Sequence, residues 1–208
     1  MANKNPYGKS YFRRTQARTE NKGFFGEMDY FINLSEVSGE DYILDIGCGT
    51  GSSMRYFKDK GFKNIYGIER SFYALKTYCQ GFPVCNALSE KLPVKLSSMD
   101  FVFMSHVIGH VADVGNTIKE VRSSLRKRGK FGVITPRLFY RIVISVKNLF
   151  TNYKTDPTVL RYYSSKKLIS DIEKHGFKLL SVQAIDFDPN GLIDRLVSKR
   201  LIAIFEAV

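Results

Sequence analysis

The sequence predicts a doubly wound α/β fold, in which helices cover both faces of a mostly parallel sheet of about seven strands. From residue 42 onward, short apolar segments alternate with segments of helical periodicity. This alternation implies right-handed crossovers onto one parallel sheet. A turn with three glycines directly follows the first apolar segment, as expected where a strand leads into a helix at a ligand-binding edge. The 208 residues suit one such domain.

Five apolar segments are expected to form the parallel part of the sheet. The first, YILDI, ends directly before the glycines, and the fourth, DFVFMS, is a continuous apolar run typical of a strand buried on both faces. Pro136 stops the fifth, because proline has no amide hydrogen for the strand ladder. The expected strands are 42–46, 64–69, 82–87, 100–105 and 130–135.

Helical segments separate these strands. Ser71 is expected to cap the beginning of one helix, and Gly61 is expected to close another. In the helix expected over 114–129, the cations of the last turn complement the helix dipole. The expected helices are 52–61, 71–79, 114–129 and 165–176.

Two further strands are expected at the C-terminal edge. Residues 178–185 and 201–208 are apolar and have no full helical pattern between them. We therefore expect an antiparallel, hairpin-like pair there.

Two segments depart from the alternating pattern. Residues 1–23 are polar and basic, which predicts an N-terminal arm or cap over a site, followed by a single domain over 24–208. Residues 138–150 have an apolar helical face. They predict either an ordinary packing helix or a lid that lines a substrate pocket, within a lid-like insertion at 137–163.

The net charge is +12, with lysines and arginines concentrated at 4–22, at 119–130 and between Arg137 and Lys178. Such a balance can attract RNA, an anionic membrane surface or a phosphorylated substrate, or it can simply keep the surface solvated. No basic run is interleaved with aromatic residues as in a nucleic-acid groove. The solvated interpretation is therefore favoured, and the others stay open.

The cellular location and the cysteines follow from composition. No apolar run reaches the roughly 18–20 residues of a membrane-spanning helix, and the N-terminus lacks the apolar core of a signal peptide. Cys48, Cys79 and Cys85 show no paired metal-ligand spacing. We expect a cytoplasmic protein with free, mostly buried thiols and no metal site.

Gly47, Gly49 and Gly51 alternate in DIGCGTG, directly after the first strand. Without side chains, they allow unusual backbone angles and a close approach to a ligand. A dinucleotide-binding loop has the spacing G-x-G-x-x-G, whereas the third glycine here comes one residue earlier. Asp45 precedes the loop, where its charge disfavours a pyrophosphate and favours a cationic ligand. These features argue against NAD.

Glu69 ends the second expected strand in the segment GIER, 18 residues after Gly51. A carboxylate at this position can accept both hydrogen bonds of a ribose diol. The alternative is a glutamate that merely faces solvent, but the position of Glu69 behind the glycine loop favours ribose binding.

Several motifs in this order resemble those of class I S-adenosylmethionine-dependent methyltransferases. They are DIGCGTG, GIER, Leu92-Pro93, MDFVFMSHVIGHVAD and LRKRGKFGVITP. The chain is most similar to the small-molecule subgroup that includes the ubiquinone and menaquinone C-methylating enzymes. The resemblance covers about residues 40–136, and 161–177 is similar to the next helix of the family. It implies a Rossmann-like fold and S-adenosyl-L-methionine as the cofactor.

The resemblance also implies a cofactor site. Asp45 would reach the methionine amino group, Gly47 and Gly49 would pack against the methionine portion, Glu69 would bind the ribose, and Arg70 would lie against the adenine. The whole predicted set is Asp45, Gly47, Gly49, Gly51, Glu69, Arg70, Asn86, Ala87, Leu88 and Ser105.

The adenine end of this site has two alternatives. If the third strand's end is the anchor, Asn86 takes the position of the family's adenine-binding aspartate, and its side-chain oxygen can accept a bond from the adenine amino group. If Leu92-Pro93 is the anchor, Leu88 takes that position and no such bond exists. Backbone amides of Ala87 or Leu88 can contact the adenine in either case.

Methyl transfer from this cofactor is an in-line displacement by an oxygen, nitrogen or carbon nucleophile, and a proton acceptor can be needed. His106 follows the fourth expected strand and His110 lies four residues later, so a helix beginning here would put both on one face. Both are catalytic candidates, with His106 the preferred base, although either can instead order the loop. Tyr7, Tyr11 and Phe12 can fold over the cofactor, or belong to a disordered arm.

Three functions compete. The favoured one is methylation of a small molecule, which can be linked to a lipid or a glycan. The basic charge favours an RNA methyltransferase as the alternative, although the fourth strand ends in MSHV and not in the Asn/Asp-Pro-Pro-aromatic signature of enzymes that methylate exocyclic amines of bases. A non-catalytic cofactor-binding protein on the same fold is the third.

Overall fold

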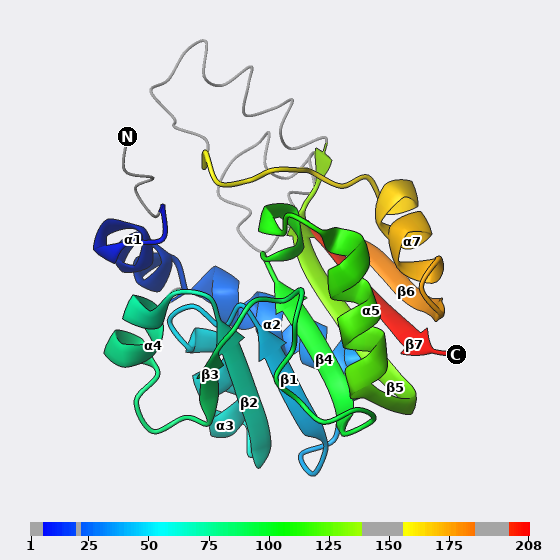
Figure 1. Cartoon of the computed structure of the whole chain (residues 1–208), viewed down its shortest axis with the longest axis horizontal. Coiled ribbons are helices and arrows are strands. Elements are labelled where there is room, and N and C mark those ends of the chain that lie inside the picture. Colours follow the sequence, from blue (N-terminus) through cyan, green and yellow to red (C-terminus); the bar gives the residue numbers. More distant parts are fainter. Residues whose placement is uncertain (1–5, 20–21, 139–155, 186–199) are drawn as a thin grey trace.

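The computed structural model describes residues 6–19, 22–138, 156–185 and 200–208 (Figure 1). Within these residues a seven-stranded sheet has the order β3-β2-β1-β4-β5-β7-β6. The strands are β1 (Tyr42–Ile46), β2 (Asn64–Glu69), β3 (Val84–Asn86), β4 (Met99–Ser105), β5 (Leu125–Pro136), β6 (Phe177–Ile185) and β7 (Arg200–Ala207). The helices are α1 (Lys9–Thr19), α2 (Lys22–Ser35), α3 (Ser52–Asp59), α4 (Phe72–Tyr78), the 3-10 helix η1 (Ile108–His110), α5 (Val114–Ser124) and α7 (Ser165–Glu173).

The topology confirms the predicted doubly wound fold. Strands β1 to β5 are parallel, and the chain reverses its direction of progress across the sheet between β1 and β4. The predicted antiparallel C-terminal pair is also present. However, β7 lies between β5 and β6 and is antiparallel to both, so that β6 forms the edge. The central place of β7 agrees with its burial, because Leu201 to Phe205 are all buried.

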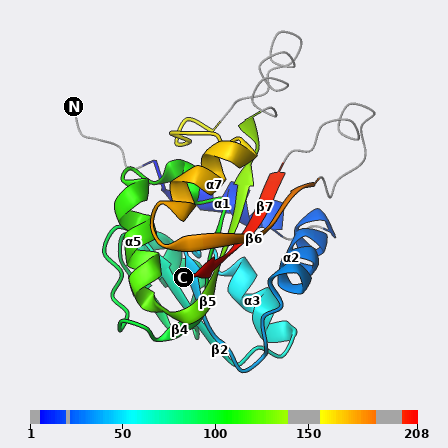
Figure 2. The same ribbon diagram turned by 90° about the vertical axis from the view of Figure 1, so that its right-hand side faces the viewer.

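Helices cover both faces of the sheet (Figure 2). On one face, α2 and α3 bring Met28, Phe31 and Phe57 into one buried cluster. On the other face, α5 and α7 bring Ile118 and Ile172 into a second cluster. The two faces therefore carry separate cores, as expected for a sheet buried on both sides.

The ends of two predicted helices agree with their capping residues. Ser71 caps α4 and accepts a hydrogen bond from the Ala74 amide at 3.4 Å. Gly61 follows the end of α3 with φ of +88°, a conformation that glycine adopts without strain. Cys48 and Cys79 are buried free thiols as predicted, and Cys85 is exposed.

The predicted helix over 114–129 is wrong at its C-terminal end, because α5 ends at Ser124. The amides of Ser97 and Ser98 donate to the carbonyl oxygens of Ser123 and Ser124, each at 2.9 Å. These bonds satisfy carbonyl groups that a helix end leaves free. Leu125 then enters β5, where it is buried and pairs with Met99 of β4.

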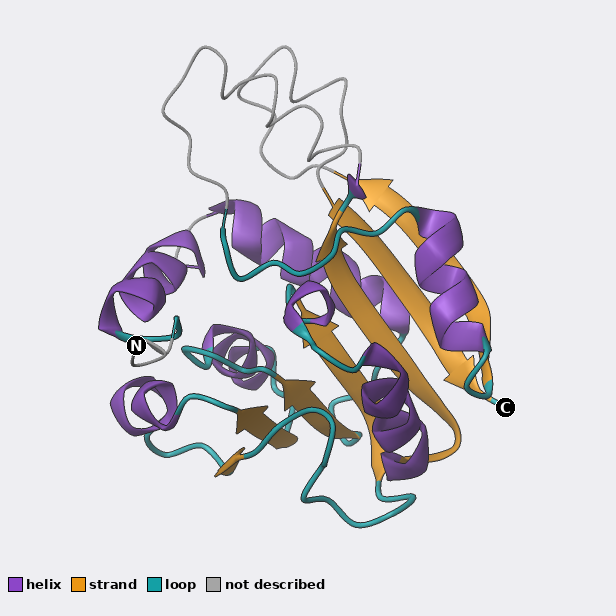
Figure 3. Ribbon diagram, turned by 45° about the horizontal axis from the view of Figure 1, so that its top comes forward, coloured by secondary structure: helices purple, strands orange, loops and turns teal. Residues whose placement is uncertain are grey.

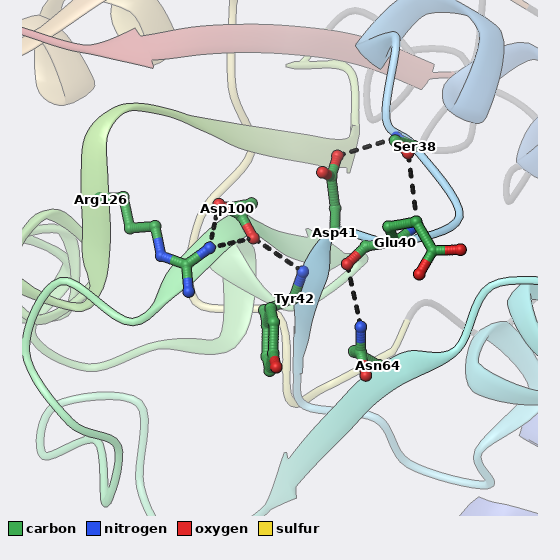
Figure 4. A network of polar contacts seen from close by, with 7 residues as sticks. All are labelled: Ser38, Glu40, Asp41, Tyr42, Asn64, Asp100 and Arg126. Atoms are coloured by element: carbon green, nitrogen blue, oxygen red, sulfur yellow. Dashed lines mark hydrogen bonds and ion pairs between the residues drawn. The ribbon is translucent and has the colours of Figure 1, made fainter.

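The basic residues after Ser124 consequently belong to a strand. Arg126 Nη1 lies 2.6 Å from both carboxylate oxygens of Asp100, and Oδ2 of Asp100 also accepts the Tyr42 amide at 2.9 Å (Figure 4). Arg128 has a φ of +63°, which bends the strand before its regular pairing begins. Asp100 thus ties together the beginnings of β1, β4 and β5.

The N-terminal prediction and the predicted insertion are described in part. Residues 9–19 form α1, and Lys22–Ser35 forms α2, which packs on the sheet. The division into an arm over 1–23 and a domain over 24–208 stays a prediction. Most of the predicted lid over 137–163, including nearly all of the apolar helical face, lies outside the described residues. Among the helices that are described, none has both the length and the apolar character needed to cross a membrane.

Candidate active site

Two adjoining cavities open at the carboxyl ends of β1, β2 and β4, where the strand order reverses. The first cavity has a volume of about 160 Å³ and the second about 380 Å³. Figure 3 shows α1 and the segment before α7 on the same side of the sheet as these strand ends. Residues that line both cavities mark their junction: Tyr11, Thr15, Gly47, Gly49, Ser105, His106 and His110.

The glycine loop connects β1 to α3 with left-handed backbone conformations. The φ angles of Gly47, Gly49 and Gly51 are +75°, +54° and +72°. A Cβ atom on Gly47 would lie 2.5 Å from Cγ2 of Val107, so a side chain at this position would clash as well as strain the backbone. Gly47 and Gly49 line both cavities.

Gly51 has a different role from the other two glycines. It lines neither cavity and is the residue that precedes α3. A Cβ atom here would lie 3.2 Å from the Cys79 sulfur. Gly51 therefore allows the turn into α3, and it does not face the site.

Asp45 is a buried carboxylate with an unpaired oxygen. The residue is 2% exposed and lines the second cavity, and its Oδ2 atom has no hydrogen-bond partner. Burial, followed by the nearby Cys79 and Glu69, raises the pKa of Asp45 well above its ordinary value. An unpaired buried acceptor is costly. A positively charged donor bound beside it would satisfy the oxygen and lower its pKa.

Glu69 stands at the end of β2, in the wall of the first cavity. Its Oε2 accepts the Gly49 amide at 3.1 Å, and its Oε1 accepts the Ser71 amide at 2.8 Å. These bonds fix the carboxylate, and each oxygen keeps a lone pair for a ligand hydroxyl. Burial raises the pKa of Glu69 despite these bonds.

Some of the residues predicted at the adenine end line the first cavity, and one of them does not. Ala87 and the half-exposed Leu88 line the first cavity, whereas Asn86 lines neither cavity. The side-chain nitrogen of Asn86 donates to the Glu69 carbonyl oxygen at 2.8 Å. This bond uses the side-chain nitrogen and leaves Oδ1 uninvolved, so the alternative in which Asn86 Oδ1 accepts from the adenine stays a prediction. The Arg70 guanidinium lies over the Tyr7 ring, 5.0 Å from its centre, and Arg70 also lines the first cavity.

The N-terminal aromatic residues line the first cavity, and one of them reaches its junction with the second. Tyr7 and Phe12 line the first cavity, and Tyr11 lines both. Phe12 is 2% exposed, and its ring centre lies 6.3 Å from that of Tyr73 on α4. Phe12 of α1 thus covers the glycine loop at Gly49.

The two histidines both line the junction, although no single helix carries them. His106 precedes η1 and has a φ of +59°, and its amide donates to the Ile134 carbonyl oxygen at 2.7 Å. His106 Nε2 lies 3.2 Å from Glu27 Oε1. His110 ends η1, and its Nδ1 lies 2.9 Å from Thr158 Oγ1. Burial lowers the pKa of His110.

Glu27 and Arg200 belong to the second cavity and were missed by the sequence analysis. Glu27 on α2 is 1% exposed, and its Oε2 lies 2.6 Å from Arg200 Nε at the start of β7. Burial alone would raise the pKa of Glu27, but the opposing effects of His106 and Arg200 bring it below its ordinary value. Glu27 is therefore ionised at neutral pH. Nothing in the local sequence signals this pair, because its members are far apart in the chain.

Residues 16–182, which are most of the chain, match the family model described as a methyltransferase domain. The chain belongs to this family. A curated relative of this methyltransferase is the ubiquinone/menaquinone biosynthesis C-methyltransferase UbiE of Campylobacter jejuni subsp. jejuni serotype O:2. The two are 25% identical over 187 residues, which cover 76% of this chain and 78% of the relative.

Two further comparisons concern part of the chain and the fold. The tRNA U34 carboxymethyltransferase of Hahella chejuensis is 29% identical over 106 residues, which are 47% of this chain and 32% of that protein. An S-adenosylmethionine-dependent methyltransferase structure from Mesorhizobium loti matches with a TM-score of 0.71 at 16% identity, over 90% of this chain and 99% of that one. The predicted class I S-adenosylmethionine-dependent methyltransferase is confirmed.

The residues of this methyltransferase fit S-adenosylmethionine. The unpaired Oδ2 of Asp45 suits the positively charged amino group of the methionine portion. Gly47 and Gly49 line both cavities, so a ligand bound there can approach their main chain. Of the ten predicted cofactor residues, all line one of the two cavities except Gly51 and Asn86.

Proposed function

We propose that this methyltransferase methylates an oxygen, nitrogen or carbon atom of a small molecule bound in the second cavity. The observation that carries the proposal is the junction of the two cavities at His106 and His110, beneath the N-terminal aromatic residues. The first cavity takes the adenosine portion of the cofactor, beside Glu69. The second has room for an acceptor next to the glycine loop. The acceptor can itself be attached to a lipid or a glycan.

When bound, the cofactor supplies a methyl group that its sulfonium activates. Asp45 holds the amino group, Glu69 holds the ribose hydroxyls, and the backbone at Gly47 and Gly49 contacts the methionine portion. Tyr11 covers the junction and Phe12 covers the first cavity, where they would exclude water. The chain's contribution is then mainly to align the acceptor atom with the methyl group, which can account for several kcal/mol of the barrier.

His106 and His110 are the groups at the junction that can accept a proton from the acceptor. Because Glu27 is ionised, it can only accept hydrogen bonds. The hydrogen between Glu27 and His106 therefore belongs to His106 Nε2, which leaves Nδ1 as the nitrogen with a free lone pair. Arg200 holds Glu27 from the other side, so that the carboxylate keeps the ring in this tautomer.

An RNA methyltransferase is the second candidate. The net charge of +12 favours it, as does the partial likeness to a tRNA-modifying relative. Against it, no basic run in the sequence is interleaved with aromatic residues as in a nucleic-acid groove, which favours a small molecule instead. A cytoplasmic location agrees with either substrate. A protein that binds the cofactor without turnover is the third candidate.

Methyl transfer from a labelled cofactor to separated fractions of a cell extract tests the proposal. We expect product in the small-metabolite or lipid fraction. Product in the RNA fraction alone would replace our proposal with the second candidate. Cofactor binding by calorimetry without product in any fraction would favour the third.

A further inference from the structure

The chain returns to the active site at residues 156–163, directly before α7. Figures 1 and 3 both show this segment crossing the upper side of the sheet toward α7. The amides of Leu160 and Arg161 donate to the Gly109 carbonyl oxygen at 2.9 and 3.1 Å, and the Arg161 side chain donates to the Val111 carbonyl oxygen. A Cβ atom on Gly109 would lie 2.8 Å from the Arg161 carbonyl oxygen. Gly109 in η1 therefore lets residues 156–163 pack closely against the loop that carries His106 and His110.

The seated segment brings a carboxylate and a hydroxyl to His110. Oδ1 of Asp156 accepts the Thr158 amide at 2.9 Å and the Thr158 hydroxyl at 2.6 Å. The same hydroxyl oxygen lies 2.9 Å from Nδ1 of His110. The three side chains therefore form a continuous chain of hydrogen bonds.

The number of available hydrogens decides which group donates and which accepts in this series of hydrogen bonds. A threonine hydroxyl has one hydrogen, and Thr158 gives it to Asp156. The hydroxyl oxygen must then accept from His110, so Nδ1 carries the ring hydrogen. Nε2 of His110 is left with the lone pair, and the ring lines both cavities where they join.

The surroundings of His110 keep the ring neutral. Burial has the largest effect and lowers the pKa, and His106 lowers it further, whereas Asp156 and a hydrogen bond with the main chain of Thr158 raise it. The Tyr7 ring approaches from the N-terminal side, 6.5 Å between ring centres, and Arg161 is bonded to the loop that follows His110. The first cavity also places Glu69, Arg70, Glu90 and Tyr11 on its wall, together with His110.

We propose that His110 Nε2 accepts the proton that the acceptor loses, and that Thr158 and Asp156 are the residues that position it. This inference rests on the proposed function. The bond between the acceptor atom and the methyl carbon forms as the carbon–sulfur bond breaks, the sulfur keeps that electron pair, and the acceptor's proton moves to Nε2. The substrate class is accordingly one with a hydrogen on the reacting atom: a hydroxyl, an N–H group or an activated C–H group.

The tautomer can be measured without a substrate, by NMR of the full chain labelled with ¹⁵N-histidine. We expect the hydrogen of His110 on Nδ1 in the wild type and in Thr158→Ser, which keeps the hydroxyl. Thr158→Val has the same shape but no hydroxyl, and should shift the hydrogen toward Nε2. Thr77→Val, an identical change on the exposed part of α4, should leave the His110 signals unchanged. A hydrogen on Nε2 in the wild type, or no response in Thr158→Val, would overturn the inference.

Activity toward the extract fraction that yields product completes the test. Thr158→Val should lower kcat about 10-fold or more and change its pH profile with little change in the KM of the cofactor, and Thr158→Ser should restore both. His110→Asn should lower kcat at least as much as Thr158→Val does. Undiminished kcat in His110→Asn with a loss in His106→Asn would assign the proton to His106 and refute our inference. Failure of the proposed function is distinguishable, because it would leave the wild type without small-molecule product.

Discussion

The buried carboxylate of Asp45 does not stabilise the cofactor-free protein at neutral pH. The residue is 2% exposed, and one oxygen lacks a hydrogen-bond partner. The resulting cost is repaid only by a ligand that brings a positively charged donor. Two measurable consequences follow, one for binding and one for stability.

Asp45→Asn should weaken S-adenosylmethionine binding about 10- to 100-fold, because a hydrogen bond to a charged group contributes about 1.5–3 kcal/mol. Calorimetric titration measures this directly. Asp59→Asn, an equivalent change at the exposed end of α3, should bind the cofactor like the wild type. Equal affinity in wild type and Asp45→Asn would remove Asp45 from the site.

The same substitution should stabilise the cofactor-free protein at neutral pH by about 1 kcal/mol. The pKa of Asp45 is raised in the folded state, so the folded protein binds this proton more tightly than the unfolded chain. The contribution of Asp45 to stability is therefore complete below its unfolded pKa and is lost as the pH rises through the folded pKa. Urea unfolding at several pH values should show the advantage of Asp45→Asn growing with pH. A constant difference would mean that Asp45 is not buried as a charge.

At this scale the sequence was informative where the chemistry is local. Asp45 and Glu69 lie at the carboxyl ends of two neighbouring parallel strands, and Gly47 and Gly49 follow the first of them, so all four come to one edge of the sheet. The adenine end was less accessible. The side-chain nitrogen of Asn86 is held by the Glu69 carbonyl oxygen, a contact that no sequence pattern specifies.

Among the elements, α1 covers the junction through few but buried contacts. Phe12 packs against α4. A Cβ atom on Gly49 would lie 3.8 Å from the Phe12 ring. We expect Phe12→Ala to weaken cofactor binding about 10-fold, mainly through faster dissociation, because the cover over the loop loosens. Stopped-flow measurement of cofactor release tests this. Phe25→Ala removes a ring that is 41% exposed on α2 and should not change the release rate. An unchanged rate in Phe12→Ala would show that α1 does not retain the cofactor.

Element boundaries were predicted where the capping chemistry is local and missed where tertiary contacts decide. Ser71 and Gly61 mark helix ends within one turn, and both agree with the structure. The helix expected to run to 129 stops at Ser124, because Leu125 gains burial in the sheet and Arg126 pairs with Asp100. A basic helical face and a basic strand beginning look alike in sequence.

At the scale of the whole molecule, the second cavity gathers residues from remote parts of the chain. Glu27 comes from α2, His106 from the end of β4, and Arg200 from the start of β7. The insertion of β7 between β5 and β6 brings Arg200 opposite Pro136 and hence to the site. A sequence without pairing information gives Glu27 and Arg200 the appearance of surface residues.

Glu27, which lines the second cavity, also contributes to the stability of the fold. Because it is 1% exposed and charged, Glu27→Gln should destabilise the fold by about 2 kcal/mol at pH 7, by leaving Arg200 without its buried counter-charge. The pKa of Glu27 is lowered in the folded state, so its contribution is present above the unfolded pKa and is lost as the pH falls through the folded pKa. In urea unfolding, the wild type and Glu27→Gln should differ at neutral pH and converge in acid. Glu36→Gln breaks an exposed pair with Lys130 and should cost less than about 1 kcal/mol. If Glu27→Gln were as mild as Glu36→Gln, the buried charges would not hold α2 to β7, and the acceptor side of the site would need another anchor.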